Sequence, residues 1–572
     1  MTWQESFKEW NTYTNLNEYE RRDLDALQED EAKLEDAFYQ PLSFGTAGMR
    51  GLIGAGTNRM NIYTVRQATE GLAQYILKAG EEAKARGVAI AYDSRHFSQV
   101  FAIEASKVLG LHGIKSFVFE SLRPTPELSF AVRYLKTFSG IMITASHNPA
   151  EYNGYKVYNE TGAQITPEVA DEITTYIQEV DNPLTLETAD YDELRKDNVT
   201  SIIGDVIDKA YLEEMKSVTV DKNLIDQHAK DVSIIFTPLH GTGGFIGMKA
   251  LEQAGFHDVH TVESQFKPDA NFETVEKPNP EDAEAFELAI EKGIKIDADA
   301  LIATDPDADR LGMAVKVSKG EYKLLTGNQI ASLLLAYLLQ AKKDTNTLPD
   351  NGVMVKSLVS GELPAAIATA YEVETQNVLT GFKYIADKIE NFEQDGSREF
   401  LFGFEESFGY LIEPFARDKD AIQTLVLVAE LVTYYKSKGQ TPYDGLVELF
   451  ETYGYFIEET VSHKLEGQDG AKEIQAIMTK LRNEQPSEFA GYKVSVYEDY
   501  ESNERIENGK TSQLDTPKAN VLKYLLDDGS WIAIRPSGTE PKIKFYFGVK
   551  ADKEETANEK LESLKASLFE LL

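Results

Sequence analysis

Short apolar runs alternate with longer amphipathic segments between residues 61 and 407. The apolar runs predict strands, whereas the amphipathic segments have the periodicity of helices. The predicted strands are 88–93, 114–120, 140–146, 232–239, 257–263, 298–305, 352–360, 375–381 and 400–407. The predicted helices are 61–83, 97–113, 125–135, 244–255, 281–293, 328–343, 362–372 and 383–392. This alternation is typical of βαβ units, in which helices cover both faces of a sheet.

Each of three successive cycles ends in an apolar strand that runs into a polar loop. We therefore predict three similar α/β domains with mixed sheets, at residues 1–205, 206–322 and 323–452. Ligands of open α/β sheets bind beyond the carboxyl ends of the strands, so these loops are where chemistry is expected. A charged, exposed helix is also predicted near the N-terminus, at residues 17–38.

The pattern changes after residue 453, where strands predominate. The predicted strands are 455–465, 494–500, 531–537 and 543–550, and the predicted helices are 469–484 and 554–572. These elements predict a smaller C-terminal α+β domain at residues 453–572, with mostly antiparallel strand pairing. No long Pro- or Ser-rich linker separates the four domains, so we expect them to lie side by side around a central cleft.

The charge of the chain limits its partners. It has 58 basic and 95 acidic residues, which gives a net charge of −37. The far field therefore repels nucleic acid and anionic membranes, and neither is expected as a partner. A small anionic ligand is compatible with this charge if basic residues gather locally at its site.

The chain has no cysteine, which excludes disulfides, thiolate nucleophiles and Cys-type zinc sites. Its first ten residues lack the apolar segment of a secretory signal, and no apolar run reaches the length of a membrane span. We therefore expect a cytoplasmic protein. A monomer or a homodimer fits the sequence, and nothing in it indicates a protein partner.

The first candidate loop, TASHNP at 144–149, carries a serine from a strand into an Asn-Pro turn. Such a turn breaks the strand ladder and is expected to expose the hydroxyl of Ser146. An ordinary turn serine is the alternative, whereas a hydrolase elbow is excluded because the flanking positions lack the glycines of that motif. His147 and Lys156 follow closely and have groups that orient a substrate or move a proton.

The second loop, DPDADR at 305–310, places an aspartate at every other position. In an extended loop, Asp305, Asp307 and Asp309 therefore lie on one side. Three adjacent carboxylates repel unless a cation neutralises them, and oxygen ligands favour Mg²⁺ or Ca²⁺ over zinc. An EF-hand is excluded because its glycine and final glutamate are absent. A solvated acidic turn is the weaker alternative, because the preceding strand is strongly apolar.

The third loop, GFEESFG at 403–409, offers paired acceptors after a buried strand. Such acceptors suit the recognition of sugar hydroxyls, because one carboxylate accepts from two of them; a glycine-bounded turn is the alternative. The segment Arg417–Asp420 follows and contains cations for a phosphate or a proton donor.

The fourth loop, RPSGTEPK at 535–542, combines an arginine fork, two hydroxyls and a glycine. These groups predict an anion cradle, because arginine binds phosphate through two parallel bonds and glycine allows backbone N–H groups to approach. No Walker loop occurs in the chain. The segment GTGG at 241–244 lacks the third glycine of a dinucleotide fingerprint, so it predicts a tight strand-to-helix connection.

Together and in this order, the four loops resemble those of the α-D-phosphohexomutase family, which includes phosphoglucomutases and phosphomannomutases. The resemblance covers nearly the whole chain, from FGTAGMRG at 44–51 to the fourth loop. The length, FGTAGMRG and GFEES look most like the larger bacterial phosphoglucomutases and relatives that act on pentose phosphates. Phe404 stands where many relatives have glycine, and no histidine follows Ser407. The family fold, three α/β domains and one α+β domain around a central cleft, agrees with the predicted elements.

The resemblance implies an isomerase, an intramolecular phosphotransferase that moves a phosphoryl group between C1 and C6 of a hexose. Glucose 1-phosphate and glucose 6-phosphate would be its substrates, with glucose 1,6-bisphosphate as activator and intermediate. Ser146 would carry the phosphate, and the three aspartates with a phosphoserine oxygen would hold Mg²⁺. Arg50, Lys156 and Lys419 match positions near the reacting phosphate, and Arg310 would support the phosphoserine. Implied substrate-binding residues are Thr380, Gly381, Glu405, Ser407, Arg535, Ser537, Gly538 and Thr539.

Proton transfer and substrate choice leave alternatives. Lys156 and Lys419 are candidates for the general acid and base, with His147 behind them. Mannose or pentose phosphates could replace glucose phosphates, or another donor could be used to make the bisphosphate. A phosphatase would need water at the site and would leave the sugar loop unexplained. A non-catalytic sugar-phosphate-binding protein needs neither a nucleophile nor a metal.

Overall fold

The computed structural model describes residues 2–45, 48–465, 467–537 and 542–572. The chain forms two compact units. The first unit comprises Met1–Leu325, Ala386–Asp395 and Ser407–Gly439, and the second comprises Thr326–Ile385, Gly396–Glu406 and Gln440–Leu572.

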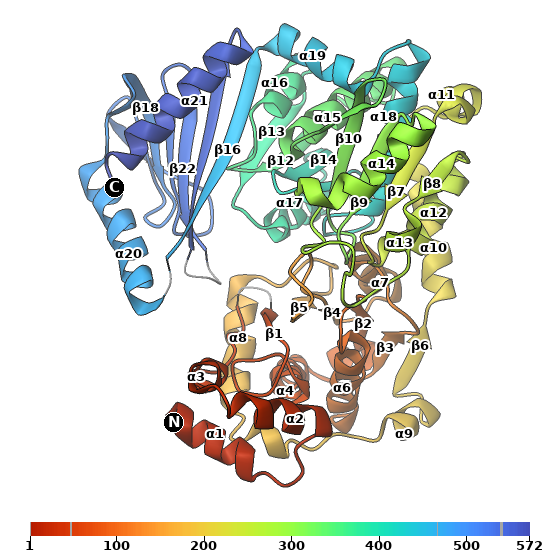
Figure 1. The fold of residues 1–572 in the computed structure, drawn as a ribbon, viewed down its shortest axis with the longest axis vertical. Coiled ribbons are helices and arrows are strands. Elements are labelled where there is room, and N and C mark those ends of the chain that lie inside the picture. The colour runs from red at the N-terminus through yellow and green to blue at the C-terminus, as the bar shows by residue number, and fades with distance from the viewer. Residues whose placement is uncertain (1, 46–47, 466, 538–541) are drawn as a thin grey trace. The chain divides into compact units, whose positions relative to one another are not determined.

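A six-stranded mixed sheet organises the N-terminal part of the first unit, in the order β1-β5-β4-β2-β3-β6. The pairs β2–β4, β2–β3 and β3–β6 are parallel, whereas β5 is antiparallel to β1 and β4. The strands are β1 (Gly48–Leu52), β2 (Val88–Tyr92), β3 (Ser116–Phe119), β4 (Ser139–Ile143), β5 (Tyr152–Tyr158) and β6 (Thr200–Ile203). The helices are α1 (Trp3–Thr12), α2 (Glu18–Leu27), α3 (Glu31–Phe38), α4 (Ile62–Ala79), α5 (Glu81–Arg86), α6 (Ser98–Leu111), α7 (Thr125–Leu135), α8 (Pro167–Gln178) and α9 (Tyr191–Lys196). Helices α6 and α7 both pack against β2 and β4 (Figure 1).

Local sequence explains where these helices begin and end. Asn61 caps α4 by accepting hydrogen bonds from the backbone N–H groups of Tyr63 and Thr64. At the other end α4 is capped by Gly80, whose φ of 105° suits glycine. The predicted N-terminal helix is instead two helices, α2 and α3. Asp30 divides them, because its side chain accepts from the N–H of Lys33 and so starts a new helix.

A five-stranded sheet follows in the first unit, in the order β11-β10-β9-β7-β8. Strand β7 is parallel to β8 and β9, and β10 is antiparallel to β9 and β11. The strands are β7 (Ile234–Thr237), β8 (Val259–Thr261), β9 (Ala300–Thr304), β10 (Leu311–Ser318) and β11 (Glu321–Leu324). The helices are α10 (Asp205–Met215), α11 (Lys222–His228), α12 (Gly243–Ala254), α13 (Glu263–Phe266), α14 (Glu287–Ile296) and α18 (Ala421–Ser437), which packs against α12 and follows the short strand β15 (Gly409–Leu411).

The second unit begins with three parallel strands in which β12 lies between β13 and β14. The elements are α15 (Gly327–Asp344), β12 (Gly352–Ser357), α16 (Leu363–Ala370), β13 (Glu374–Val378), α17 (Phe382–Asp395), β14 (Glu399–Glu405) and α19 (Pro442–Tyr453). Helix α17 continues into the first unit after Ile385.

An antiparallel sheet forms the C-terminal part of the second unit, in the order β16-β23-β22-β21-β18-β19-β20. The strands are β16 (Tyr455–Lys464), β17 (Glu488–Phe489), β18 (Tyr492–Asp499), β19 (Glu504–Glu507), β20 (Lys510–Gln513), β21 (Leu522–Leu526), β22 (Trp531–Pro536) and β23 (Lys542–Ala551). Helices α20 (Gly467–Glu484) and α21 (Glu554–Phe569) share a hydrophobic core with this sheet, and Figure 1 shows α21 along it. The predicted antiparallel pairing is confirmed.

The second unit also joins its two sheets through a common apolar cluster. Leu358 and Leu379, which follow β12 and β13, pack with Trp531 and Tyr546 of the antiparallel sheet. The ammonium group of the buried Lys523 donates to the carbonyl oxygen of Leu358 over 2.6 Å. These contacts fix the loops after β12 and β13 against the strand that leads to the fourth candidate loop.

The predicted strands and helices of the α/β part are largely confirmed, with a few corrections. The predicted helix 281–293 begins as a 3₁₀ turn at Ala283–Phe286, and α14 starts only at Glu287. The predicted strand 257–263 is confined to β8. Strands β1, β5, β6, β10, β11 and β15 were not predicted. Among the described residues, no helix is long and apolar enough to cross a membrane.

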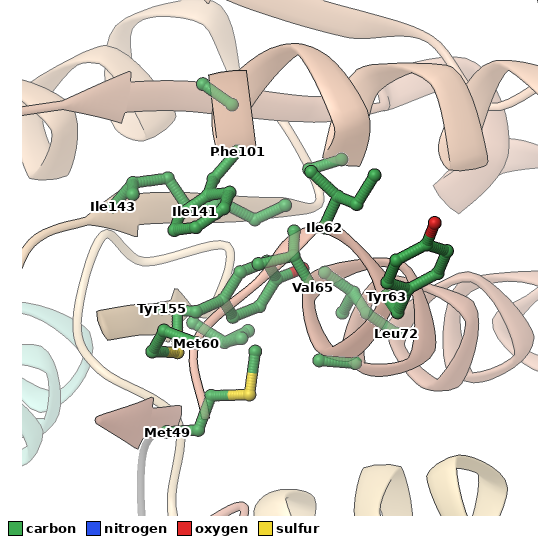
Figure 2. Packing of buried hydrophobic residues seen from close by; sticks show 14 of the residues in the cluster. Met49, Met60, Ile62, Tyr63, Val65, Leu72, Phe101, Ile141, Ile143 and Tyr155 are labelled. Carbon is green, nitrogen blue, oxygen red and sulfur yellow. The ribbon is translucent and has the colours of Figure 1, made fainter. Parts of the chain in front are cut away.

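The N-terminal core of the first unit depends on α4, whose apolar face meets the six-stranded sheet. Figure 2 shows Leu72 and Val65 of α4 packed with Ile141 and Tyr155. Leu72 is fully buried, whereas Leu111, at the end of α6, is 45% exposed.

We expect Leu72→Ala to lower the free energy of unfolding of the first unit by about 2–5 kcal/mol, because it removes buried contacts and leaves a cavity. Leu111→Ala makes the same chemical change on the surface and should cost no more than about 0.5 kcal/mol. Urea denaturation of both variants measures the difference. Equal losses would show that α4 is not packed as described.

Candidate functional site

The serine loop begins where β4 ends. The N–H of Ser146 donates to the hydroxyl oxygen of Thr144 over 2.9 Å, and the N–H of Asn148 donates to the carbonyl oxygen of Ala145. Ser146 has a φ of 52°, a left-handed conformation that is uncommon for a residue with a side chain. The predicted exposure of its hydroxyl is wrong, because Ser146 is only 3% exposed.

The buried Ser146 hydroxyl faces the aspartate loop. Its Oγ donates to Oδ2 of Asp305 over 2.8 Å, and Nδ1 of His147 lies 3.2 Å from the same Oγ. Arg50 lies on β1 opposite Gly154 of β5, and its Nη1 donates to Oδ1 of Asn148 over 3.1 Å. The structure therefore brings Arg50, Ser146 and His147 together with the aspartate loop.

The three aspartates converge as predicted. Asp305, Asp307 and Asp309 are all buried, and each offers a carboxylate oxygen within 4.8 Å of the others. The loop is a turn and not the extended segment predicted: the N–H of Ala308 donates to the carbonyl oxygen of Asp305, and Ala308 has a φ of 52°. Oδ1 of Asp305 accepts from the N–H groups of Asp309 and Arg310, which closes the turn.

Two lysines from distant parts of the chain neutralise the triad. Nζ of Lys156, on β5, lies 2.9 Å from Oδ2 of Asp307 and 3.8 Å from Oδ2 of Asp309. Nζ of Lys419 lies 3.2 Å from Oδ2 of Asp309 and 3.2 Å from Oδ1 of Asp418. Both predicted lysines therefore stand at the aspartates.

The electrostatics of the triad separate its members. Burial and the repulsion of Asp307 and Asp309 raise the pKa of Asp305 well above its ordinary value. Burial acts the same way on Asp307, but the charge of Lys156 and the hydrogen bonds from Asp305, Lys156 and Thr125 together outweigh it, so the pKa of Asp307 is lowered. For His147, burial and the nearby guanidinium groups of Arg310 and Arg50 lower the pKa well below its ordinary value. The imidazole is therefore neutral at neutral pH.

The donor set fits a hard divalent cation. Oδ1 of Asp307 and Oδ1 of Asp309 are buried and accept no hydrogen bond from the described residues. Buried carboxylate oxygens without a donor are costly unless a cation meets them. Three aspartate oxygens at this spacing are ligands of the kind that Mg²⁺ and Ca²⁺ prefer. The triad is thus able to hold a metal ion.

The GTGG segment lies directly under the aspartate loop. A Cβ on Gly241 would fall 2.3 Å from Cα of Pro306, so only glycine fits there. The N–H of Thr242 donates to the carbonyl oxygen of Pro306 over 2.8 Å. The segment is the tight connection between β7 and α12 that the sequence predicts, and it packs against the aspartate loop at Pro306.

The predicted sugar-loop residues lie mainly in the second unit. Oε1 of Glu405 accepts from the N–H of Gly381 over 2.7 Å, and Gly381 has a φ of 124° that glycine tolerates. Oγ1 of Thr380 is buried and has no hydrogen-bond partner among the described residues. The structure thus brings Thr380, Gly381 and Glu405 together. Ser407 belongs to the first compact unit and not to the second.

The remaining predicted residues have varied surroundings. Arg535 lies near the end of β22, and Ser537 follows the strand; the N–H of Ser537 donates to the carbonyl oxygen of Lys542 over 2.7 Å. Gly538 and Thr539 lie outside the described residues. Arg310 forms an ion pair with Glu281, with Nη1 and Oε1 separated by 2.5 Å.

Three residues at the site were not predicted from the sequence. The hydroxyl of Thr125, at the start of α7, donates to Oδ2 of Asp307 over 2.8 Å. Asp418 accepts from the hydroxyl of Tyr158 and pairs with Lys419. Arg95 follows β2 and donates to the backbone of the serine loop. A signal was available for Arg95, because it lies just past the carboxyl end of a buried strand.

Fold and site together define a class: a multidomain α/β protein in which a serine hydroxyl lies against a buried cation-binding triad. The chain belongs to the phosphoglucomutase/phosphomannomutase family. Residues 41–184, 209–319 and 326–453 match alpha/beta/alpha domains I, II and III of that family, and residues 468–566 match its C-terminal domain. The predicted resemblance and fold class are confirmed, and the chain is an isomerase that acts as a phosphotransferase on sugar phosphates.

Several relatives are similar over nearly their full length. The chain is 41% identical over 540 residues to a phosphoglucomutase of Staphylococcus aureus (strain USA300), which covers 94% of this chain and 95% of that protein. It is 39% identical over 540 residues to a phosphoglucomutase of Staphylococcus saprophyticus, with 94% and 96% covered.

Solved structures share the fold at low sequence identity. The open form of the Paramecium phosphoprotein pp63/parafusin, a phosphoglucomutase, has a TM-score of 0.69 at 18% identity, covering 93% of this chain and 96% of that one. A putative phosphomannomutase from Thermus thermophilus has a TM-score of 0.68 at 21% identity, covering 93% and 99%.

Asp420 follows Lys419 and is fully buried at the start of α18. It accepts from the N–H groups of Ile422 and Gln423 and from the hydroxyl of Tyr211. Burial, which outweighs these hydrogen bonds, raises the pKa of Asp420 from 3.8 to about 6. The folded chain therefore binds this proton more tightly than the unfolded chain does.

We expect the contribution of Asp420 to the free energy of unfolding to be fully present below pH about 4 and to fall by about 3 kcal/mol in all as the pH rises through about 6. Asp420→Asn should remove this dependence, so its stability relative to the wild type should rise over that interval. Urea denaturation across the interval measures the difference. Asp190→Asn is the control, because Asp190 caps α9 from an exposed position. An Asp420→Asn curve parallel to the wild type would contradict the assignment.

Proposed function

We propose that this chain interconverts glucose 1-phosphate and glucose 6-phosphate through a phosphorylated Ser146 and a glucose 1,6-bisphosphate intermediate. The observation that carries the proposal is the hydroxyl of Ser146, held 2.8 Å from a carboxylate of the buried triad. The relatives named phosphoglucomutase, 41% identical over 94% of the chain, support glucose as the sugar.

The first half-reaction is a phosphoryl transfer from Ser146 to a sugar hydroxyl. The bond between phosphorus and Oγ of Ser146 breaks as the sugar oxygen bonds to the same phosphorus. The proton of the sugar hydroxyl passes to a base, and the departing Oγ takes up a proton from an acid. The bisphosphate then turns over, and its other phosphoryl group returns to Ser146: the serine hydroxyl gives its proton to a base, and the departing sugar oxygen takes up a proton from an acid. The protein contributes mainly positioning and charge stabilisation, because phosphoryl transfer needs little covalent help.

Asp305, Asp307 and Asp309 would hold Mg²⁺, together with an oxygen of the phosphorylated Ser146. When bound, the ion would neutralise negative charge on the transferring phosphoryl group. Lys156 and Lys419 already touch the triad and would add positive charge beside the same oxygens.

The proton carriers are proposed from the same cluster. Lys156 and Lys419 are the first candidates for general acid and base, since both ammonium groups are held within 4 Å of the triad. His147 is the third, because its lowered pKa keeps the imidazole neutral and therefore able to accept a proton. Arg50 and Arg310 would bind the transferring phosphate and support the phosphoserine.

Recognition of the sugar and of the phosphate that is not transferring is proposed for the remaining residues. Oε1 of Glu405 accepts from the N–H of Gly381, which fixes this carboxylate beside the loop after β13, and we assign it to the sugar hydroxyls. The proposed set is Thr380, Gly381, Glu405 and Ser407 for the sugar, with Arg535, Ser537, Gly538 and Thr539 for the phosphate.

The family match supports a division of the chain into four domains. We propose domain limits at 1–205, 206–322, 323–452 and 453–572, which correspond to the four matched family domains in the same order. The cytoplasm is the proposed location, and a monomer or a homodimer is the proposed assembly.

Other sugar phosphates are the competing substrates. Mannose 1-phosphate or a pentose 1-phosphate would use the same serine and triad, since neither contacts the sugar ring by our assignment. A phosphoserine phosphatase would release inorganic phosphate, and a sugar-phosphate-binding protein would show no turnover.

We expect Ser146→Ala to lose conversion of glucose 1-phosphate to glucose 6-phosphate by at least about 1,000-fold, because it removes the phosphoryl carrier. The assay uses Mg²⁺, a trace of glucose 1,6-bisphosphate and parallel detection of inorganic phosphate. Ser106→Ala is the control, since Ser106 is a buried serine in α6 whose hydroxyl bonds Ser116 and Thr200, away from the triad. Turnover retained by Ser146→Ala would refute the proposal, and release of phosphate would indicate a phosphatase.

We expect Mg²⁺ to raise the melting temperature of the wild type, because an ion that binds only the folded state stabilises it by about 2.7 kcal/mol at a hundredfold excess over its dissociation constant. Asp307→Asn should abolish most of this shift. Asp297→Asn is the control, because Asp297 is an exposed carboxylate paired with Lys316, away from the triad. Equal shifts in both variants would place the ion away from the triad.

A further inference from the structure

Arg95 is a buried arginine that joins four points of the serine loop. Its Nη2 donates to the carbonyl oxygens of Ser146 and Asn148 over 2.5 and 2.6 Å. Its Nη1 donates to the carbonyl oxygens of Pro149 and Tyr152 over 2.8 and 3.0 Å. One guanidinium group therefore binds the backbone of the loop from the reactive serine to the start of β5.

The guanidinium group is itself fixed from two other directions. Its Nε lies 3.2 Å from Oδ2 of Asp93, and both side chains are fully buried. Oδ1 of Asp93 accepts from the N–H of Arg95 and from the hydroxyl of Ser98. The ring of Phe272, from the segment after β8, lies 4.9 Å from Cζ of Arg95. Contacts outside the serine loop therefore also fix the position of the Arg95 guanidinium group.

The loop needs such an anchor because Ser146 is in the left-handed region, with a φ of 52°. A residue with a side chain persists there only where its surroundings determine the conformation. Several carbonyl oxygens that point toward one position also repel one another, and a cation at that position reverses the repulsion. A planar guanidinium with five donors meets this arrangement, whereas the ammonium of a lysine has three donors and no fixed fork.

We propose that Arg95 is the positioning residue that holds Ser146 in its left-handed conformation and so directs its hydroxyl toward Asp305. The inference rests on the proposed function for its kinetic consequence, but not for its structural one. Arg95 touches no reacting atom; it acts through the backbone of the loop. Displacement of a reacting group by about 1 Å is enough to slow a reaction about 100-fold.

The test compares Arg95→Lys with Arg59→Lys. Arg59 is a matched control, because it is also buried in the first unit, pairs with Asp36 over 2.6 Å and donates to the carbonyl oxygens of Asp36 and Asn58. Two readouts are taken on each purified protein: the rate at which glucose 1,6-bisphosphate phosphorylates Ser146, followed by mass spectrometry, and hydrogen exchange of the amides of residues 144–152.

We expect Arg95→Lys to slow phosphorylation about 100-fold at saturating bisphosphate, with the half-saturating concentration nearly unchanged. Exchange should quicken at the amides of Thr144, Asn148 and Tyr152, which donate within or beside the loop. Arg59→Lys should keep the wild-type rate and exchange at these amides. A wild-type rate and exchange in Arg95→Lys, or equal losses in the two variants, would overturn the proposal.

A second variant decides the matter if Arg95→Lys does not fold. Asp93→Asn keeps an acceptor for Ser98 and for the N–H of Arg95 but removes the ion pair, so about a tenfold slowing supports the proposal and a wild-type rate overturns it. If the wild-type chain itself is not phosphorylated by the bisphosphate, the proposed function fails. Hydrogen exchange then still tests Arg95, since it needs no substrate.

Discussion

Asp305, Asp307 and Asp309 are buried, and each places a carboxylate oxygen within 4.8 Å of the others. Several parts of the first unit supply the groups that offset the repulsion between these carboxylates. Burial of unpaired charge is expensive, so each carboxylate needs a donor or a cation. The donors come from the N-terminal sheet and its helix α7, through Lys156 and Thr125, and from the segment before α18, through Lys419. The carboxylates of one six-residue loop therefore bind residues from parts of the chain that are far apart in sequence.

Lys419 is held in place at the triad by contacts on its stem and on its ammonium group. The stem of Lys419 passes so near Gly409 that a Cβ there would fall 2.0 Å from Cδ of the lysine. On the other side, Asp418 accepts from Tyr158 of β5 and from the lysine itself. The absence of a side chain at Gly409 therefore leaves room for the stem of the lysine, and Asp418 binds its ammonium group. Both features confine a flexible side chain in the folded protein, which lowers the conformational entropy that is lost when it binds at the triad.

Sequence predicted the features that local chemistry determines. The alternating pattern indicated most helices and strands, and the spacing of Asp305, Asp307 and Asp309 predicted a cation site whose side chains do converge. Helix α18 was missed because it is buried almost all round and has no polar face to reveal its period. Strand β5 was missed because YNGYKVY lacks a simple apolar alternation. The burial of Ser146 and the contacts of Thr125 depend on tertiary placement, which no local pattern contains.

Burial of Ser146 bears on the choice between a mutase and a phosphatase. A phosphoserine transfers its phosphoryl group to any suitably placed hydroxyl, including that of water, so its lifetime depends on excluding water. Ser146 is 3% exposed, and its hydroxyl lies against Asp305 and His147. A phosphatase would instead need an open approach for a water molecule and a base aimed at it. The surroundings of Ser146 therefore favour transfer to a bound sugar. Bulk water has little access to the serine, whereas a sugar hydroxyl is placed beside it by the contacts that bind the sugar.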